Sequence, residues 1–266
     1  MKKLYLKLIE LFEKPLKTSA VVGAKYTILQ LLGKGSYGFT YLVKDEKDDI
    51  KVLKQLRKYK RVEESARNSF LFEAQVLSDL TDKAFPTLLD QFEDKGKLFI
   101  VMEYMHGKTY EELIFIEGLK FSETEAFKEL SKILQLVQKI HLKGYVHRDL
   151  RIPNILKAEN NVFIIDFGLA KRINEASEVQ EEAFKNEEKR LFREVSFKSD
   201  LYALGHFMLF LLYSSYEPVS HQSRSWEEEL PIKEESKRLI RKMLQLDEPY
   251  HHVNELINDL DNNLFK

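Results

Sequence analysis

The sequence predicts an α+β protein in which a strand-rich N-terminal part is followed by a mainly helical C-terminal part. From about residue 26 to 104, most segments are short and rich in Val, Ile and aromatic residues, with Gly or Asp turns between them. From about residue 108 onward, apolar residues recur at helical spacing. A chain of 266 residues is long for one core and short for two full domains. We therefore expect an N-terminal extension and two lobes, with bounds at 1–20, 21–105 and 106–266.

Composition excludes several classes of function. The chain contains no Cys, so disulfides, zinc–thiolate sites and thiol nucleophiles are excluded. Its formal net charge of −1 gives no field that would attract nucleic acid, and we expect no nucleic-acid partner. The longest apolar run covers residues 201–213 and is shorter than the ~20 residues of a bilayer span. This run predicts a buried helix.

The first element is an amphipathic helix that ends near Pro15. Lys7 and Glu10 interrupt the apolar run, which argues against a signal peptide. Its apolar residues recur at helical spacing: Leu4, Leu8, Leu11 and Phe12. Such a helix packs on the body of the protein or, through residues 1–14 and their lysines, contacts a membrane surface or a partner. Both alternatives remain open at this point.

Four strands and one helix follow in the first lobe. The strands are expected near residues 26–33, 39–43, 50–56 and 97–104, and the helix at 66–80. Glu73 lies on the apolar stripe of that helix, where an unpaired carboxylate is costly. Lys54, at the end of an alternating strand, is the expected ion-pair partner of Glu73 and could hold phosphates. The Gly-rich turn "GKGSYG" is followed by a strand rather than a helix, which favours a flap over ATP instead of a dinucleotide fold.

Helices dominate the second lobe. A capping box, Ser122 and Glu125, begins a helix that closes at Gly144. A short hairpin follows, formed by "NIL" and "VFIIDFG" with "AENN" as its turn, and later helices are expected at 201–213 and 234–246. The segment "YVHRDLRIPNIL" places Asp149 and Asn154 near this hairpin, and Asp166 ends it. Asn154 and Asp166 offer the oxygen ligands that Mg²⁺ takes, which leaves Asp149 to accept a hydroxyl proton.

These motifs, taken in order, resemble the eukaryotic-type (Hanks-type) serine/threonine protein kinase family over about residues 26–266. The set is the Gly-rich loop, Lys54, Glu73, "HRDLRIPN" and "DFG". The resemblance implies a two-lobed kinase fold, with an antiparallel sheet and one helix in the first lobe and mainly helices in the second. It also implies a compact, bacterial-like, cytoplasmic enzyme that uses ATP and Mg²⁺ to phosphorylate Ser or Thr hydroxyls of protein substrates.

The resemblance assigns roles to individual residues of this sequence. Asp149 would act as base, Arg151 would stabilise the transferring phosphate, and Lys54, held by Glu73, would position ATP. Asn154 and Asp166 would hold Mg²⁺. The residues implied at the nucleotide are Leu32, Gly33, Gly35, Gly38, Thr40, Val52, Lys54, Met102, Glu103, Met105 and Leu156. Asp200, before the buried helix, would brace the backbone of the catalytic loop.

The sequence departs from the family in two places. Arg151 stands where most serine/threonine kinases carry Lys, whereas some tyrosine kinases also carry Arg at this position. A tyrosine acceptor therefore stays an alternative to the favoured Ser or Thr. The segment after Gly168 lacks the Ala-Pro-Glu motif and instead predicts partly helical structure within 177–195, with glutamates that could reach Arg148. His251 or His252 stands where the family places the Arg partner of that motif. A kinase-fold enzyme acting on a small molecule or lipid, and a catalytically silent nucleotide-binding module, are therefore alternatives.

Overall fold

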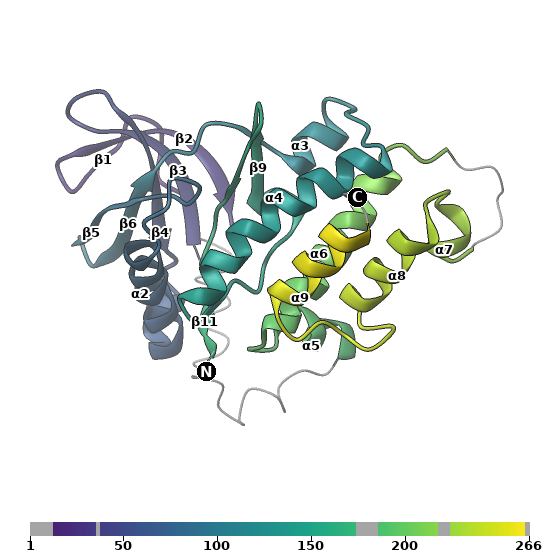
Figure 1. Ribbon diagram of the computed structural model, residues 1–266. Coiled ribbons are helices and arrows are strands. Elements are labelled where there is room, and N and C mark those ends of the chain that lie inside the picture. Colours follow the sequence, from purple (N-terminus) through teal and green to yellow (C-terminus); the bar gives the residue numbers. More distant parts are fainter. Residues whose placement is uncertain (1–12, 36–37, 174–185, 218–223, 264–266) are drawn as a thin grey trace. The chain divides into compact units, whose positions relative to one another are not determined.

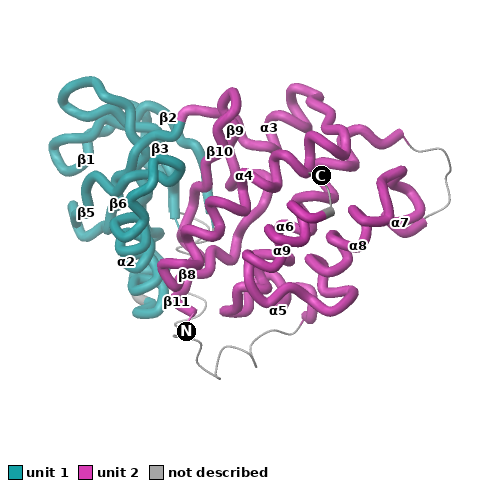
Figure 2. Tube along the Cα trace, viewed as in Figure 1, with its two compact units in different colours: residues 1–105 teal, residues 106–266 magenta. Residues whose placement is uncertain are grey.

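The computed structural model describes residues 13–35, 38–173, 186–217 and 224–263. The chain divides into two compact units, residues 1–105 and 106–266 (Figure 2). The expected N-terminal helix lies outside the described residues up to residue 12, and residues 13–20 form irregular and turn structure. None of the helices in the described part of the chain is long and apolar enough to cross a membrane.

The first unit is built on one antiparallel sheet with the strand order β1-β2-β3-β4-β6-β5 (Figure 1). Its strands are β1 (Val21–Val22), β2 (Tyr26–Lys34), β3 (Gly38–Lys44), β4 (Ile50–Leu56), β5 (Leu88–Asp94) and β6 (Lys97–Glu103). A short 3₁₀ helix, η1 (Lys60–Val62), leads into the helix α2 (Glu64–Asp79). The four expected strands and the helix are all present, and β1 and β5 are additional strands.

One face of this sheet forms the core of the first unit. Alternate residues of β2, β3, β4 and β6 point to this face and are almost fully buried: Ile28, Phe39, Tyr41, Val43, Leu53, Phe99 and Val101. Leu16 and Ala20 pack against the same cluster, so the chain that precedes β1 is held on this face. On β3, β4 and β6 these core residues are the odd-numbered ones, so the even-numbered residues between them point to the opposite face.

The second unit is mainly helical (Figure 1). Its helices are α3 (Tyr110–Phe115), α4 (Glu123–Leu142), α5 (Glu187–Arg193), α6 (Phe197–Tyr213), α7 (Trp226–Glu229), α8 (Glu234–Met243) and α9 (Val253–Asn263). Its short strands and 3₁₀ helix are β7 (Lys108–Thr109), β8 (Tyr145–Val146), η2 (Ile152–Asn154), β9 (Ile155–Ala158), β10 (Asn161–Ile164) and β11 (Lys171–Arg172). The expected hairpin corresponds to β9 and β10, which pair antiparallel.

Helix α6 is the central buried element of the second unit. It packs against α4, α5 and α8, and its apolar side chains from Leu201 to Leu212 are mostly buried. The predicted capping box of α4 is present, with the Ser122 side chain accepting from the Glu125 backbone and the Glu125 carboxylate accepting from the Ser122 backbone. The structure therefore confirms an α+β protein whose first unit is a sheet with one helix and whose second unit is mainly helical.

Candidate functional site

The register of β3, β4 and β6 brings several predicted nucleotide residues onto one face of the first unit's sheet. Val52 lies opposite Met102, and Lys54 lies opposite both Thr40 on β3 and Ile100 on β6. Residues that face each other across antiparallel strands point to the same side of the sheet. This face therefore carries a short apolar row beside an ammonium group, which suits an adenine ring followed by phosphates.

The predicted ion pair between Lys54 and Glu73 is present. The Lys54 Nζ donates to the Glu73 carboxylate, which comes from the buried stripe of α2. The Glu73 side chain is 4% exposed and that of Lys54 is 13% exposed, so the pair is largely shielded from water. A buried carboxylate needs such a partner, and the pair in turn fixes the ammonium in one place on the sheet face.

The Gly-rich turn is shaped by one close backbone contact. A Cβ on Gly38 would lie 2.8 Å from the Gln55 carbonyl oxygen of β4, so only glycine fits there. A Cβ on Gly33 would meet nothing within 4 Å, which leaves space beside the backbone for a ligand. The Gly35 carbonyl accepts from Arg57 Nη1 at 3.4 Å, and the Arg57 Nε lies 3.5 Å from the Glu13 carboxylate. Glu13 also accepts from the Lys58 backbone N–H at 2.7 Å.

The remaining predicted nucleotide residues lie at the ends of strands. Met102 and Glu103 end β6, Met105 is buried just after it, and Leu32 on β2 is 45% exposed. The Glu103 carboxylate accepts from the Thr87 hydroxyl at 2.9 Å. Leu156 belongs to the second unit, where it lies on β9 and is buried.

In the second unit, Asp200 braces the backbone of the predicted catalytic loop, as expected. Its carboxylate accepts from the N–H of His147 at 2.9 Å and from the N–H of Arg148 at 2.7 Å. Arg148 has φ 64, a left-handed conformation that is unfavourable for a residue with a side chain. Two adjacent donors bound to one fixed carboxylate hold the loop in this conformation.

Asp200 and two histidines form a buried network beneath the loop. Burial alone would raise the pKa of Asp200, but the hydrogen bond and charge of His141 and the nearby His147 hold that pKa below its usual range. The His141 Nε2 lies 3.0 Å from Asp200. Burial lowers the pKa of His147, against the opposing attraction of Asp200 and other carboxylates, so its imidazole is held neutral. The His147 Nε2 lies 3.2 Å from the Ile165 carbonyl, which ties the loop to the end of β10.

The Asp149 carboxylate contacts three side chains from the described part of the chain. Arg151 donates from Nε to Oδ1 at 2.7 Å and from Nη2 to Oδ2 at 3.3 Å. Asn154 donates from Nδ2 to Oδ2 at 2.9 Å and to the Asp149 carbonyl at 3.0 Å. The Arg193 Nη2 forms an ion pair with Oδ1 at 2.9 Å. The loop thus brings Asp149, Arg151 and Asn154 together, as the sequence predicts, and Arg193 is an unexpected neighbour.

The donor set proposed for Mg²⁺ is chemically suitable. Because Asn154 uses its amide nitrogen to bind Asp149, its amide oxygen is the atom available as a ligand. Asp166 has φ 64 and accepts from the Gly168 N–H at 3.2 Å through one carboxylate oxygen. A carboxylate and an amide oxygen fit Mg²⁺, which keeps several water and phosphate ligands. Within the described residues there is no cluster of three or more His, Cys, Asp or Glu that could hold a metal by itself.

The segment after Gly168 is only partly described. Ser177 and the glutamates Glu175, Glu178, Glu181 and Glu182 lie outside the described residues, so the expected carboxylate contact with Arg148 stays a prediction. The described part contains α5, which agrees with the expected helical character. Arg148 donates from Nε to the Arg193 carbonyl at 2.7 Å and from Nη1 to the Leu169 carbonyl at 3.2 Å. Arg193 in turn donates to the Arg148 carbonyl.

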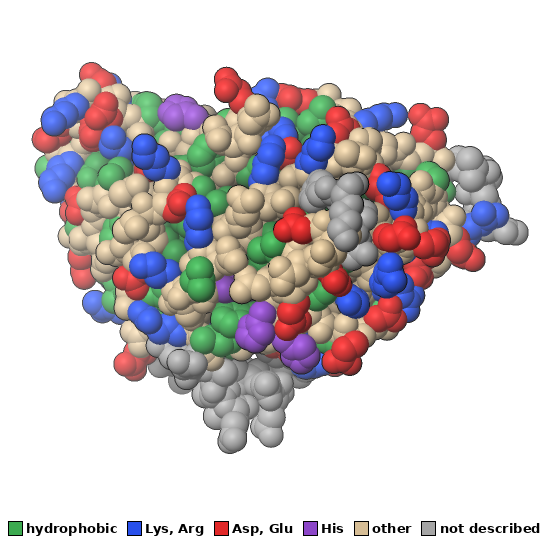
Figure 3. All heavy atoms as spheres, viewed as in Figure 1, with side chains coloured by type: hydrophobic (Ala, Val, Ile, Leu, Met, Phe, Trp, Pro, Cys, Tyr) green, Lys and Arg blue, Asp and Glu red, His purple; other side chains and the backbone are tan. Residues whose placement is uncertain are grey.

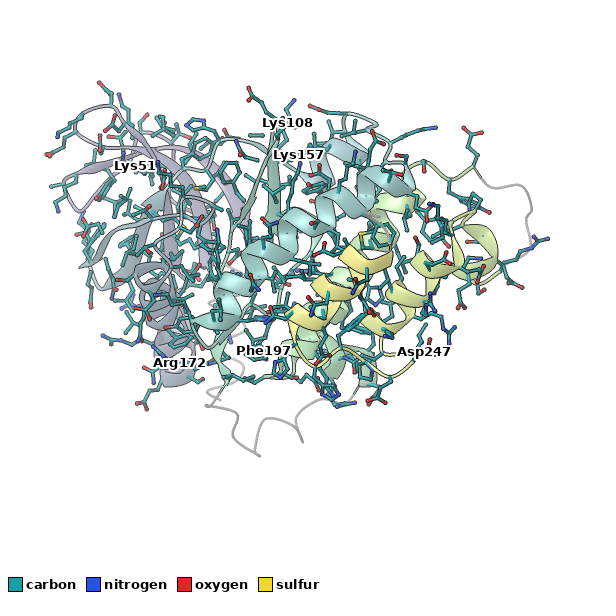
Figure 4. The ribbon with its side chains drawn as sticks, in the orientation of Figure 1. Lys51, Lys108, Lys157, Arg172, Phe197 and Asp247 are labelled. Atoms are coloured by element: carbon teal, nitrogen blue, oxygen red, sulfur yellow. The ribbon has the colours of Figure 1, made fainter. Side chains whose placement is uncertain are left out.

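Aromatic contacts stand where the resemblance implies an ion pair near the end of the chain. Phe197, labelled in Figure 4, begins α6 and stacks on His141 with the ring centroids 4.3 Å apart. The centroid of the His252 ring lies 5.7 Å from that of Phe197, so both histidines contact the same phenylalanine. No sequence pattern indicated this stack, because its three rings come from three distant segments of the chain.

Comparison with known proteins identifies what the chain resembles as a whole. A family model described as "Protein kinase domain" matches residues 26–264. The chain is 32% identical over 252 residues to the probable serine/threonine-protein kinase YbdM of Bacillus subtilis, covering 94% of each. It is 29% identical to serine/threonine-protein kinase B of Synechocystis over 85% of this chain and 44% of that protein. The chain thus spans nearly all of the first relative and less than half of the second.

The fold is also that of solved kinase domains. The crystal structure of the Mycobacterium tuberculosis PknI kinase domain (C20A mutant) aligns with a TM-score of 0.70, 19% sequence identity, and coverage of 93% of this chain and 99% of that one. At this identity the likeness concerns the fold alone.

Proposed function

The chain belongs to the protein kinase domain family, and from this we propose that it is an ATP-dependent protein kinase that phosphorylates Ser or Thr hydroxyls. The observation that carries the proposal is the catalytic loop of the second unit. Asp149 lies there with Arg151 and Asn154 in hydrogen-bond contact, on a backbone braced by Asp200. A carboxylate, a guanidinium and an amide whose oxygen can bind a metal, all on one loop, are parts that phosphoryl transfer needs.

Each residue has a proposed task. Asp149 accepts the proton of the acceptor hydroxyl, and Arg151 stabilises the charge on the transferring phosphate. Lys54, positioned by Glu73, holds the α- and β-phosphates of ATP. Asn154 and Asp166 would bind Mg²⁺, which neutralises phosphate charge when it is present. The sheet face of Thr40, Val52 and Met102, with the other nucleotide residues named above, would take the adenine and ribose.

The substrate and the location follow from the same proposal. Protein acceptors are favoured because both named bacterial relatives are serine/threonine-protein kinases. A cytoplasmic location is part of the proposal, since ATP is supplied there. A membrane or partner contact through residues 1–14 stays a prediction. On the face shown in Figure 3, acidic and basic side chains are interspersed over both units.

The test is phosphate transfer from γ-labelled ATP with Mg²⁺ to peptides that carry Ser, Thr or Tyr as the sole acceptor. Parallel incubations contain small hydroxyl compounds, lipid vesicles or no acceptor. We expect transfer to Ser or Thr peptides. Transfer only to a small molecule, a lipid or Tyr would overturn the acceptor assignment, and no transfer in any incubation would overturn the enzyme assignment.

Three variants make the test specific for the site. Asp149→Asn removes the base and Lys54→Met removes the phosphate contact, and each should lower kcat/KM by roughly 10²–10⁴-fold. The matched control is Lys51→Met, a lysine of the same strand, labelled in Figure 4, that pairs with Asp45 and Asp49. The control should retain activity. Near-normal turnover by Asp149→Asn would contradict the assigned role of that residue.

A further inference from the structure

The carboxylate of Asp149 is fully occupied in this structure. An ionised carboxylate has about four lone-pair positions on its two oxygens. Four nitrogens lie within 3.3 Å of these oxygens: Arg151 Nε and Nη2, Asn154 Nδ2 and Arg193 Nη2. Asp149 is also buried, with 8% of its surface exposed. An acceptor hydroxyl that is to give its proton to Asp149 must therefore replace one of these contacts.

Among the described residues that contact the Asp149 carboxylate, Arg193 is the one that comes from outside the catalytic loop. Arg151 and Asn154 lie within five residues of Asp149 in the sequence and hold it from within its own loop. Arg193 is the last residue of α5, which follows the DFG motif along the chain. Its backbone and side chain also exchange contacts with Arg148, so the end of α5 and the loop hold each other. Movement of Arg193 would open one acceptor position on Oδ1, while Arg151 Nε keeps its contact with the same oxygen and the hydrogen bonds within the loop stay in place.

The displaced guanidinium then needs another anion. The Arg193 side chain is 22% exposed, and a partly buried cation that loses its carboxylate is left uncompensated. Two glutamates of the same segment, Glu187 and Glu194, already bind Arg190, at 2.5 and 3.2 Å. An anion carried by the acceptor itself would replace Asp149 as the partner of Arg193 at the moment when the hydroxyl takes its place on Asp149.

We propose that Arg193 is a specificity-determining residue, which occupies the acceptor position on Asp149 and selects protein substrates that carry a carboxylate or phosphate beside the Ser or Thr hydroxyl. The proposal rests on the kinase function proposed above. In the transfer, the acceptor oxygen bonds to the γ-phosphorus, the bond from that phosphorus to the bridging oxygen of ADP breaks, and the hydroxyl proton passes to Asp149. Substrates without the anion leave Arg193 on Asp149 and react slowly.

The test compares peptides that differ only beside the acceptor Ser. One set carries Asp or Glu at the flanking positions, a second carries phosphoserine, and a third carries Asn or Gln. The wild-type protein should favour the anionic peptides in kcat/KM by roughly tenfold, which is what one charge-assisted hydrogen bond supplies. Comparison of the first two sets shows whether carboxylate or phosphate is the preferred anion.

Variants of Arg193 isolate its contribution. Arg193→Gln should raise kcat for the neutral peptides, lower kcat/KM for the anionic ones, and bring their ratio near one. Arg193→Lys keeps the charge but not the planar fork, so part of the preference should remain. The matched control is Arg190→Gln, an arginine of the same helix that pairs with Glu187 and Glu194, and it should keep the wild-type ratio.

The outcomes separate this proposal from the function on which it rests. An unchanged ratio in Arg193→Gln, or an equal loss of activity toward all peptides in a variant that melts like the wild type, would overturn the role of Arg193 while leaving the kinase intact. If Arg193→Gln does not fold, the ratio in Arg193→Lys decides in the same way. Absence of transfer by the wild-type protein to every peptide would overturn the proposed function, and the proposal about Arg193 with it.

Discussion

Replacement of Asp200 by Asn should both destabilise the protein and slow the reaction. Asp200 is fully buried and its carboxylate accepts from the N–H groups of His147 and Arg148 and contacts His141. A carboxamide has one acceptor oxygen, and its NH₂ group would face another donor. At least one buried N–H therefore loses its partner, and the loop loses the charge that holds Arg148 at φ 64.

The expected magnitude follows from these contacts. A hydrogen bond to a charged group contributes about 1.5–3 kcal/mol, and an unsatisfied buried donor costs about 1–3 kcal/mol. Because the two effects overlap, we expect the free energy of unfolding to fall by roughly 2–4 kcal/mol. For a protein of this size, that corresponds to a decrease in Tm of roughly 5–15 °C. The looser loop misplaces Asp149, and kcat should fall by roughly 10–100-fold.

Thermal unfolding followed by circular dichroism, together with initial rates on a phosphorylatable peptide, measures both effects. The matched control is Asp247→Asn, which alters an exposed carboxylate paired with Arg241 at 2.8 Å and should change Tm and kcat little. A wild-type Tm and kcat in Asp200→Asn would refute the argument that this carboxylate holds the loop. A lower Tm with unchanged kcat would refute its link to catalysis.

Two further predictions concern the Gly-rich turn and pH. Glu13→Gln should raise the KM for ATP several-fold, because Glu13 contacts Arg57, which binds the Gly35 carbonyl. Glu46→Gln is the control. Equal KM values for Glu13→Gln and the wild type in initial-rate assays would contradict the role of this contact. Burial lowers the pKa of His147, so the unfolded chain binds a proton below about pH 6.5 that the folded protein does not. The contribution of neutral His147 to the free energy of unfolding should therefore be fully present above pH 6.5 and decrease below it, by at most about 1.4 kcal/mol per pH unit. Thermal melts at pH 7.5 and 5.5 that coincide would contradict this.

Much of the fold follows from local patterns in the sequence, with instructive exceptions. Strand β5 was not expected, because its Asp, Glu and Gln residues have low strand propensity. It forms because tertiary contacts outweigh propensity: Phe92 stacks on Phe99 and Tyr26, and the Tyr26 hydroxyl donates to Asp90. Helix α3 was also not expected, although the capping box of Thr109 and Glu112 that begins it is visible in the sequence.

In the candidate site, too, one contact could be predicted from the sequence and another could not. The Lys54–Glu73 pair could be predicted because a carboxylate on an apolar stripe needs a cation, and the sequence offers one at the end of a strand. The contact of Arg193 with Asp149 could not be predicted. A single arginine on a short helix with no buried residues carries no signal, and its partners lie about 45 residues earlier in the chain. Tertiary contacts bring them together: α5 packs against α6, and Arg193 exchanges hydrogen bonds with Arg148.

Because side chains alternate between the two faces of the sheet along β4, the activity depends on the register in which β4 pairs with its neighbours. Lys54 and Val52 share one side of the sheet, whereas Leu53 is buried on the other. Insertion or deletion of a single residue within β4 would exchange the two sides, turning the ammonium toward the hydrophobic core and a leucine toward the nucleotide face. The turn between β3 and β4 lies outside the ladder and is free of this constraint. Changes in length during evolution or engineering are therefore tolerated in that turn, while the adjoining strand accepts substitutions but not a shift by one.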